Sequence, residues 1–382
     1  MSGPLQGVRV LELPAIGPVP FLGMLLSDLG ATVTRIDKPG SAGNGLQLPS
    51  GPIDRGRRSV VVDLRRPGGA ELAGRLFERS DVVIEGFRPG VAERLGVGPQ
   101  VALDRNPALV YGRMTGWGQD GPLAPRAGHD ITYLAISGAL HGIGEHDRRP
   151  IPPVNYLADF GGGAMVLATG ILAALLHARA TGEGQVIDAA MTEGAAYLST
   201  LTRQLLAAGQ WVDEREHNLL DGGAPNYRCY RCSDGGYVAV GALEPKFWEE
   251  LVEVLSGVLG EDPADVPSPY DREQWAACAD WLTRSFATRS RAEWAETFAG
   301  TDACVAPVLS LAEAPDHPHN RSRGSFVGVA GAPVAAPVPR FSRTPATAGP
   351  VTPRGADTET VLDELAVAAA ERDRLRAEGV LG

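Results

Sequence analysis

The first 120 residues alternate between short apolar runs and amphipathic stretches bounded by glycine or proline. Continuous apolar runs are typical of strands buried on both faces, and the stretches between them are typical of helices that cover a parallel sheet. We predict strands at 8–13, 32–37, 59–64, 81–87 and 108–114. We predict helices at 21–29, 68–80 and 90–96. The pattern indicates an α/β fold with a parallel, Rossmann-like sheet, in which ligands bind beyond the carboxyl ends of the strands.

The remainder of the chain is organised differently. Helical patterns dominate from 129 to 210, and a stretch rich in glycine and proline then interrupts them at 221–236. Later elements are predicted to be strands at 237–243 and 304–310, and helices at 246–255, within 272–299 and at 358–378. The segment 330–355 is expected to run along the surface. We therefore expect a large α/β domain at 1–220, a smaller α+β domain at 225–325, and a segment at 326–382 that returns to the large domain.

Composition narrows the class of protein. The 382 residues are 44% hydrophobic and carry a net charge of −11, which argues against a nucleic-acid partner. There is no uninterrupted apolar run of about 18 residues, so no membrane span is expected. The longest apolar segment, Ala164 to Leu176, is interpreted as a buried core helix. The N-terminus lacks the pattern of a secretory signal, so a cytoplasmic location is expected.

No metal site is expected. Two of the four cysteines form the CxxC of "RCYRC", but zinc would need two further ligands at suitable spacing. His141 and His146 lie near acidic residues in a loop and are expected to be solvated. Residues 214–216 are interpreted as the solvated face of a helix. All four cysteines are expected to be reduced thiols.

Two helix starts carry candidate chemistry. Asp159 precedes Gly161–Gly163 at the start of an apolar helix, and aspartate is a favoured N-cap, so capping is its simplest role. Three glycines in a first turn, however, suggest that another group comes very close to the backbone. N–H groups at a helix start also suit a developing oxyanion. His129 opens another helix and is a competent base near neutral pH, although it or Asp130 could be a polar cap.

Arginines cluster in three loops at 35–40, 54–65 and 87–90, all at or near strand ends. Scattered arginines usually lie on a solvated surface, whereas this clustering fits a multiply phosphorylated ligand better. The stretch "GWGQDG" at 116–121 fits a GxGxxG pattern. Prolines follow it where a dinucleotide site needs a helix, so a glycine turn is the better interpretation.

Several segments together resemble family III CoA-transferases: "GVRVLEL", "LLSDLGATVTRIDKPG", "DRGRRSVVVDL", "SDVVIEGFRPGVAERLG" and "RMTGWGQDGP". Others narrow the resemblance to the α-methylacyl-CoA racemase branch of that family: "AGHDITYLAISGAL", "PPVNYLADFGGGAM", "GEGQVIDAAMTEG" and "NLLDGGAPNYRCYRCSDGGYVAVGALEPKFW". The resemblance runs from residue 7 to about 345. It implies a role in lipid or fatty acid metabolism, a 2-methylacyl-CoA substrate that itself carries coenzyme A, and no further cofactor.

The resemblance also implies roles for individual residues. His129 and Asp159 would be the two acid/base groups, and Glu244 would support His129. Backbone N–H groups of Asp159, Phe160 and Gly161 are expected to face the enolate oxygen. CoA contacts are expected from Arg35, Asp54, Arg55, Arg57, Arg58, Arg88, Gly128, Asp130 and Tyr133. The family implies an interlocked homodimer whose active sites lie between the large domain of one chain and the small domain of the other.

Two alternatives remain open. A CoA-transferase would use Asp159 as a nucleophile and form a covalent acyl intermediate. His129 favours the racemase, because the transferase relatives lack the histidine of "GHD". A non-catalytic acyl-CoA binding protein is the second alternative, and the presence of His129, Asp159 and Glu244 argues against it.

Overall fold

The chain forms two compact units. The computed structural model describes residues 3–40 and 49–382. The first unit comprises the described residues up to Ser137 together with Val154–Leu198 and Pro318–Gly382, and the second comprises Gly138–Pro153 and Ser199–His317. These units assign residues 138–153, 199–220 and 318–325 differently from the domain limits expected from the sequence. The units describe packing within one chain and do not test domain limits. The expected domain limits therefore stay a prediction.

A six-stranded parallel sheet organises the first unit, in the order β3-β2-β1-β4-β5-β6. Its strands are β1 Arg9–Glu12, β2 Thr32–Asp37, β3 Arg58–Val61, β4 Val82–Glu85, β5 Val110–Thr115 and β6 Gln185–Ala190. The predicted parallel α/β sheet is confirmed, and its first five strands match the apolar runs. Strand β6 was not predicted, because four of its six residues are not buried and apolar runs mark only buried strands.

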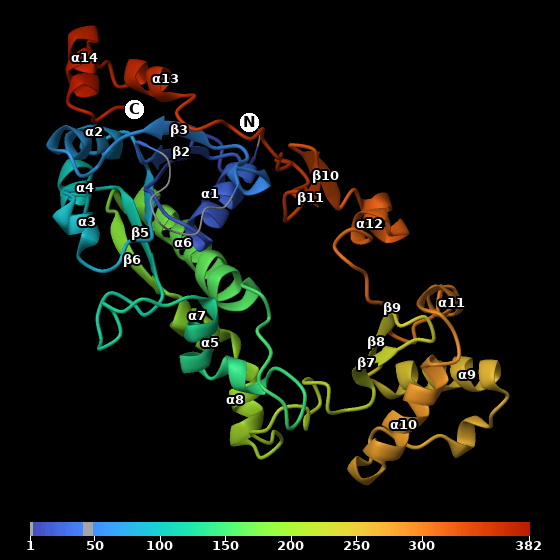
Figure 1. Ribbon diagram of the computed structural model, residues 1–382. Coiled ribbons are helices and arrows are strands. Elements are labelled where there is room, and N and C mark those ends of the chain that lie inside the picture. The colour runs from blue at the N-terminus through green and yellow to red at the C-terminus, as the bar shows by residue number, and fades with distance from the viewer. Residues whose placement is uncertain (1–2, 41–48) are drawn as a thin grey trace. The chain divides into compact units, whose positions relative to one another are not determined.

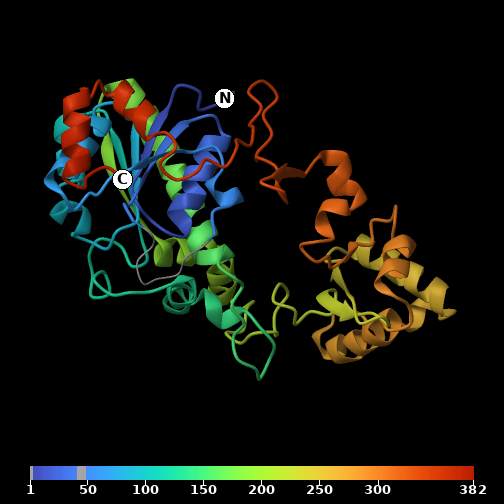
Figure 2. The same cartoon turned by 45° about the horizontal axis from the view of Figure 1, so that its top comes forward.

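Helices cover both faces of this sheet. Apart from two helices at the end of the chain, the α-helices of the first unit are α1 Pro18–Asp28, α2 Pro67–Phe77, α3 Val91–Arg94, α4 Pro99–Arg105, α5 Asp130–Ser137, α6 Val166–Thr181, α7 Met191–Leu198 and α12 Pro318–Arg323. Figure 1 shows α1 and α6 on one face and α2, α3 and α4 on the other, and Figure 2 shows the same arrangement from another direction. Helices α1, α2 and α4 each begin with proline, whose fixed φ suits the first turn.

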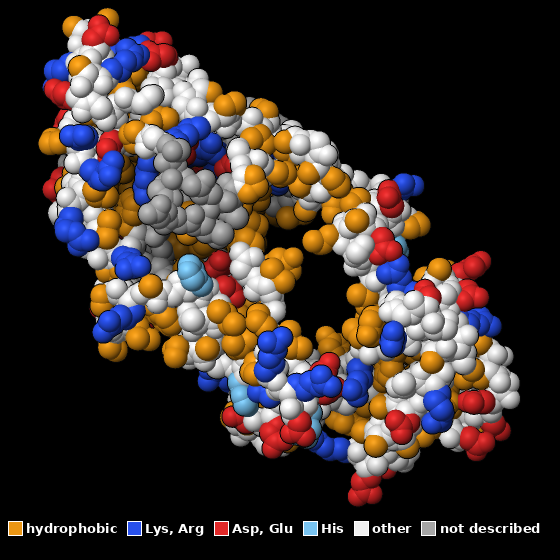
Figure 3. Space-filling model, viewed as in Figure 1, with side chains coloured by type: hydrophobic (Ala, Val, Ile, Leu, Met, Phe, Trp, Pro, Cys, Tyr) orange, Lys and Arg blue, Asp and Glu red, His pale blue; other side chains and the backbone are white. Residues whose placement is uncertain are grey.

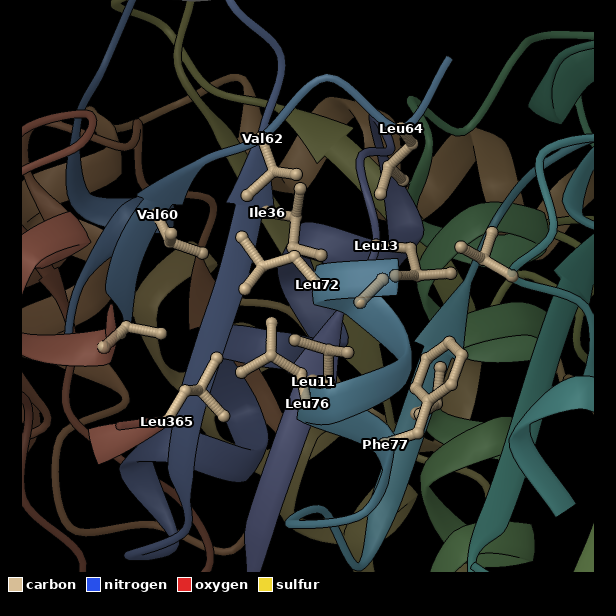
Figure 4. Close-up of a cluster of buried hydrophobic side chains, with 14 of the residues drawn as sticks. Leu11, Leu13, Ile36, Val60, Val62, Leu64, Leu72, Leu76, Phe77 and Leu365 are labelled. Carbon is tan, nitrogen blue, oxygen red and sulfur yellow. The ribbon is translucent and has the colours of Figure 1, made fainter. Parts of the chain in front are cut away.

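The largest part of the core lies between the sheet and α2 (Figure 4). Strand residues such as Leu11 and Ile36 pack with Leu72 and Phe77 of α2, and Leu365 comes from the end of the chain. Helices α13 Thr358–Glu364 and α14 Ala369–Ala377 belong to this end of the chain. The single helix predicted over 358–378 is wrong, because Ala366 adopts a left-handed φ of 52° and separates two helices. The hairpin of β10 Phe326–Val329 and β11 Ala332–Ala335 precedes them.

One helical stretch, Tyr156–Thr181, combines a π-helix at Tyr156–Met165 with α6. By length and composition alone its 26 residues could cross a membrane. Leu167 and Ile171 of α6, however, pack directly over Gly112 of β5. We interpret the stretch as a core helix of the first unit, as its sequence suggested.

The second unit is built on a three-stranded antiparallel sheet, in the order β7-β8-β9. Its elements are β7 Tyr227–Arg231, β8 Tyr237–Gly241, β9 Val305–Pro307, α8 Thr200–Ala207, α9 Pro245–Leu259, α10 Trp275–Phe286 and α11 Arg291–Thr297. Aromatic residues including Trp248, Trp281 and Trp294 fill its core. Strand β7 lies inside the stretch predicted to be a break, since glycine and proline there form turns on both sides of a strand. Short 3₁₀ turns of this unit occupy Ala139–Gly142, Pro263–Asp265, Arg272–Gln274 and Ala314–Asp316, and the first unit has one at Pro52–Asp54.

Candidate active site

Asp159 lies in the first turn of the π-helix and is half-buried. Asn155 precedes the helix and donates from Nδ2 to Oδ2 of Asp159 at 3.3 Å. Burial raises the pKa of the Asp159 carboxyl, and the negative charge of Asp130 raises it further. The hydrogen bond from Asn155 and the charge of His129 act in the opposite direction, but the net pKa is raised. The carboxyl group is therefore held where its protonated form is favoured more than in water.

Asp130 fixes the start of this helix from across the chain. Its Oδ2 accepts the backbone N–H groups of Ala158 at 2.9 Å and Asp159 at 2.8 Å. Only 7% of Asp130 is exposed, and its Oδ1 is buried without a described partner. The sequence predicts that Asp130 caps its own helix or contacts CoA. In the structure its carboxylate caps the π-helix instead, and a CoA contact stays a prediction.

The hydrogen bond from the Asp159 N–H to Asp130 affects one of the expected oxyanion donors. Because the N–H of Asp159 already donates to Asp130, an enolate oxygen would have to displace a carboxylate to use it. Inside the π-helix the N–H groups of Phe160 and Gly161 point back to carbonyl oxygens five residues earlier, and their role as oxyanion donors stays a prediction. Phe160 also stacks on Phe21 of α1, with ring centroids 4.4 Å apart, which holds the start of the π-helix beside α1.

Packing against helix α7 explains two of the glycines after Asp159. A Cβ on Gly162 would lie 2.6 Å from the backbone nitrogen of Ala195, and one on Gly163 would lie 2.8 Å from Cγ of Met191. Both neighbours belong to α7, whose own Gly194 sits against the carbonyl oxygen of Gly162. The predicted close approach to the backbone is therefore present, and at these two positions the approaching group is a helix of the same unit.

His129 lies immediately before α5 and its side chain is exposed. Its backbone N–H donates to Oγ1 of Thr132 at 2.9 Å, and the Thr132 hydroxyl donates to the His129 carbonyl at 2.7 Å. These local bonds satisfy the helix start without the imidazole. The charge of His129 lowers the pKa of Asp159, so both groups share one electrostatic environment in the first unit.

Glu244 is placed elsewhere in the chain. It precedes α9 in the second unit, is exposed, and uses its backbone carbonyl to accept N–H groups from Phe247 and Trp248 at 3.1 Å each. Its expected support of His129 stays a prediction.

Tyr133, Gly128 and Arg88 lie beside the candidate acid/base groups. Burial raises the pKa of Tyr133 to about 12, the charge of Asp159 adds to this, and the charge of Arg88 opposes it. A Cβ on Gly128 would lie 2.5 Å from the Tyr133 ring, and one on Gly116 would lie 2.1 Å from it. Gly116 therefore makes room for Tyr133, which agrees with interpreting the GxGxxG stretch as a turn.

The remaining arginines expected to contact CoA are ion-paired. Nη1 of Arg35 and Nη2 of Arg57 both bind Oδ1 of Asp54, at 2.7 and 2.8 Å. Arg57 is 1% exposed and also binds Glu12. These pairs organise the 50–57 loop beside the sheet. A phosphate would reach these guanidinium groups only by competing with their carboxylates.

Arg55 and Arg58 are paired in the same way. Arg55 binds the buried Asp28 through Nη2 at 2.6 Å, and Arg58 binds Glu364 at 3.0 Å. Arg88 is exposed. The expected CoA contacts of all these residues stay predictions. All four cysteines are free thiols, as the sequence analysis expected.

Two residues near Asp159 were not predicted from the sequence. Asn155 donates a hydrogen bond to the Asp159 carboxylate. A Cβ built on Gly17 would lie 3.6 Å from Oδ2 of Asp159. Gly17 has φ of 69° and precedes α1. The motif that includes Asn155 is "NYLAD", and its four-residue spacing to Asp159 was a usable signal. The approach of Gly17 depends on tertiary packing and left no local signal.

The arrangement of elements defines the fold class. A crystal structure of a CAIB/BAIF family protein from Brucella suis aligns with a TM-score of 0.79 at 26% identity, covering 96% of this chain and 100% of that one. The family model of CoA-transferase family III matches residues 5–358. The chain belongs to CoA-transferase family III.

Its relatives include both isomerases and transferases. Human α-methylacyl-CoA racemase is 42% identical over 99% of this chain and 97% of its own length. The beta subunit of succinyl-CoA–L-malate CoA-transferase from Chloroflexus aurantiacus is 30% identical over 95% of this chain and 94% of its own length.

Proposed function

We propose that this protein is a racemase that interconverts (2R)- and (2S)-2-methylacyl-CoA thioesters by moving one proton through an enolate. The observation that carries the proposal is Asp159, half-buried with a raised pKa, in the electrostatic environment of His129. The 42% identity to human α-methylacyl-CoA racemase supports the same chemistry.

Two different proton carriers suit inversion at one carbon. A ring nitrogen of His129 takes the α-proton from one face of the thioester, and the electron pair of that C–H bond delocalises onto the thioester oxygen. Protonated Asp159 then gives its proton to the opposite face, and the carbonyl re-forms. The reverse direction exchanges the two roles. A single base would have to reach both faces of a planar enolate.

The raised pKa of Asp159 answers a difficulty in this scheme. A helix start favours an ionised carboxylate, yet one direction requires the protonated acid. Burial and the charge of Asp130 oppose ionisation. The pair of neutral imidazole with carboxylic acid and the pair of imidazolium with carboxylate hold the same number of protons. The two enzyme forms therefore interconvert without net uptake or loss of a proton.

The enolate oxygen requires its own stabilisation. We assign this role to the N–H groups of Asp159, Phe160 and Gly161 at the start of the π-helix, where the enolate oxygen would have to compete with the Asp130 carboxylate for the first of them. One such donor is worth about 3 kcal/mol in comparable sites. The exposed Arg88, with Tyr133 and Gly128 beside it, would contact the CoA portion, together with the paired arginines if the phosphates displace their carboxylates. Glu244 would support His129.

We also propose the homodimer that the family resemblance implies, in the cytoplasm. The first unit exposes apolar side chains on α5 and α7, among them Ile131, Ile136 and Tyr197, the last 78% exposed. Figure 3 shows hydrophobic side chains gathered over this region. A second copy of the chain would cover such a face. In this assembly the second unit of one chain would complete the site of the other.

The alternative is a CoA-transferase in which the Asp159 carboxylate attacks the thioester, releases CoA and holds the acyl group. The 30% identity to a succinyl-CoA–L-malate CoA-transferase subunit favours keeping it. This reaction needs a free acid as acceptor, whereas racemisation needs only the thioester. A non-catalytic acyl-CoA binding protein would show neither reaction.

The deciding experiment incubates (2R)-2-methylacyl-CoA in heavy water and follows both deuterium at C2 and chirality. We expect one deuterium per inverted molecule with no acid present. His129→Ala should abolish inversion and retain thioester binding, while His177→Ala, an exposed histidine on α6, should behave as wild type. Full inversion by His129→Ala would contradict the two-base scheme. CoA exchange that depends on added acid, without deuterium incorporation, would establish the transferase instead.

A further inference from the structure

A cluster of metal-ligand side chains lies in the second unit, outside the candidate active site. His146, Glu214 and His217 each present one ligand atom, and these three atoms lie within 4.8 Å of one another. We propose that these side chains bind one divalent transition metal ion, with Zn²⁺ as the best fit. Two imidazoles and one carboxylate are a common zinc ligand set, and water would complete a tetrahedral site.

The His217 ring is held as a metal ligand requires. Its Nδ1 lies 3.0 Å from the carbonyl oxygen of Arg215, so a proton on Nδ1 leaves the lone pair on Nε2. That Nε2 lies 3.6 Å from Oε2 of Glu214. Two donors at about 2.1 Å from one tetrahedral zinc ion lie about 3.4 Å apart. The His217–Glu214 pair is therefore at ligand spacing before any metal binds, and the carbonyl supplies the outer contact typical of zinc-bound histidine.

His146 completes the cluster from a different segment. Its ring centroid lies 4.3 Å from that of His217, with the ring planes inclined by 68°. The Asp147 carboxylate lies 3.2 Å from Nε2 of the His146 ring, and the backbone N–H of His146 donates to Oε2 of Glu216 at 2.7 Å. The ring is thus positioned through its neighbour and through its own backbone.

Hydrogen bonds from Arg215 join the two segments that carry the ligands. Arg215 donates from Nε to the carbonyl of His141 at 3.0 Å and from Nη1 to that of Arg148 at 2.9 Å. Asp147 and Glu216, each adjacent to this cluster in sequence, adopt left-handed φ values of 56° and 57°. Such conformations are uncommon outside glycine and persist where surrounding contacts fix them, as at ligand sites.

The position of the cluster in the chain gives it a structural role. Residues 138–153 connect α5, which follows His129, to the π-helix that carries Asp159. A metal ion at His146 would fix the middle of this connection to the segment around His217. This role is independent of the proposed racemase reaction and would hold equally for a transferase.

The full-length, untagged protein is first treated with EDTA and dialysed. It is then titrated with Zn²⁺, and calorimetry measures the binding. We expect one Zn²⁺ per chain, and cobalt substitution should give the absorption of a tetrahedral ion. His146→Ala and His217→Ala should each weaken binding by about tenfold or more, since even outer-contact changes at zinc sites cost about 10–100-fold. His141→Ala is the matched control from the same segment, and it should bind zinc as wild type does.

The proposal is overturned if zinc does not bind, or if both cluster variants bind it as wild type does. A loss of binding in His141→Ala equal to that in His217→Ala would also overturn it. Circular dichroism checks that each variant is folded, and Glu214→Gln provides a conservative change with the same expected loss if an alanine variant fails to fold. Because the readout is metal binding, its result is distinct from that of the heavy-water experiment.

Discussion

Asp130→Asn tests how the π-helix start controls Asp159. The Asp130 carboxylate accepts two backbone N–H groups, from Ala158 and Asp159, and its negative charge raises the pKa of the Asp159 carboxyl. Asparagine has nearly the same shape and keeps one acceptor oxygen at the same position. The substitution therefore removes the charge while it leaves hydrogen bonding to the helix start possible.

The expected loss of stability follows from the two hydrogen bonds. A bond to a charged acceptor contributes about 1.5–3 kcal/mol, and a neutral one about 0.5–1.5 kcal/mol. Neutralising the acceptor of two bonds should cost about 2–3 kcal/mol. Part of this is offset because the buried Oδ1, which has no described partner, is no longer part of a charged group. We expect a net decrease of about 1–3 kcal/mol in the free energy of unfolding.

Two assays separate stability from chemistry. Urea unfolding followed by circular dichroism measures the first, and the pH dependence of kcat/KM for racemisation measures the second. Without the Asp130 charge the pKa of Asp159 should fall, so the acid limb of the pH profile should move to lower pH. Asp357→Asn is the control, because Asp357 accepts the Ser59 N–H at 2.9 Å on the edge strand β3. It should lose stability without moving the limb.

One combination of results would refute this reasoning. If Asp130→Asn leaves both the unfolding free energy and the acid limb unchanged, the carboxylate does not hold the helix start in solution. A limb that moves to higher pH would show that the charge of Asp130 does not oppose ionisation of Asp159.

Three further changes test other features of the structure. Because the pKa of Asp159 is raised from 3.8, wild-type stability should fall as pH rises through the folded-state pKa, and Asp159→Asn should lack this fall in urea titrations from pH 4 to 8. Gly162→Ala should destabilise the protein by about 1–3 kcal/mol or more in thermal unfolding, since the new Cβ would lie 2.6 Å from the backbone nitrogen of Ala195. Gly257→Ala is the control: its Cβ would meet open space in α9, so it should stabilise the protein by up to about 1 kcal/mol. Arg55→Met should lower the unfolding free energy by about 3–5 kcal/mol by leaving its buried carboxylate partner unpaired, and a wild-type urea midpoint would contradict this.

The parallel sheet was predictable because burial on both faces leaves a direct trace in sequence. Strands such as β4 consist of consecutive buried residues, and the apolar runs located them. Only two of the six residues of strand β6 are buried, and β7 lies between glycine-rich turns, so neither has that trace. The break between α13 and α14 occurs at an alanine, a residue whose type favours continued helix.

The candidate site was predictable in part. The residue types and helix-start positions of His129 and Asp159 pointed to acid/base chemistry, and the structure places both in the first unit. The partners that tune them were less visible. Asp130 reaches a helix 28 residues away in sequence, and the buried Arg55 and Arg57 pair with carboxylates on helix α1 and strand β1. Such pairings depend on tertiary contacts, which a single sequence does not record.

The contribution of Leu365 and Leu381 to the core of the first unit has a consequence for synthesis on the ribosome. These side chains emerge only after the whole of the second unit has been translated, so the nascent sheet waits with part of one hydrophobic face open to solvent. The antiparallel unit has all its residues available earlier and can fold first. A growing chain at that stage is the form in which we expect this protein to depend most on chaperones.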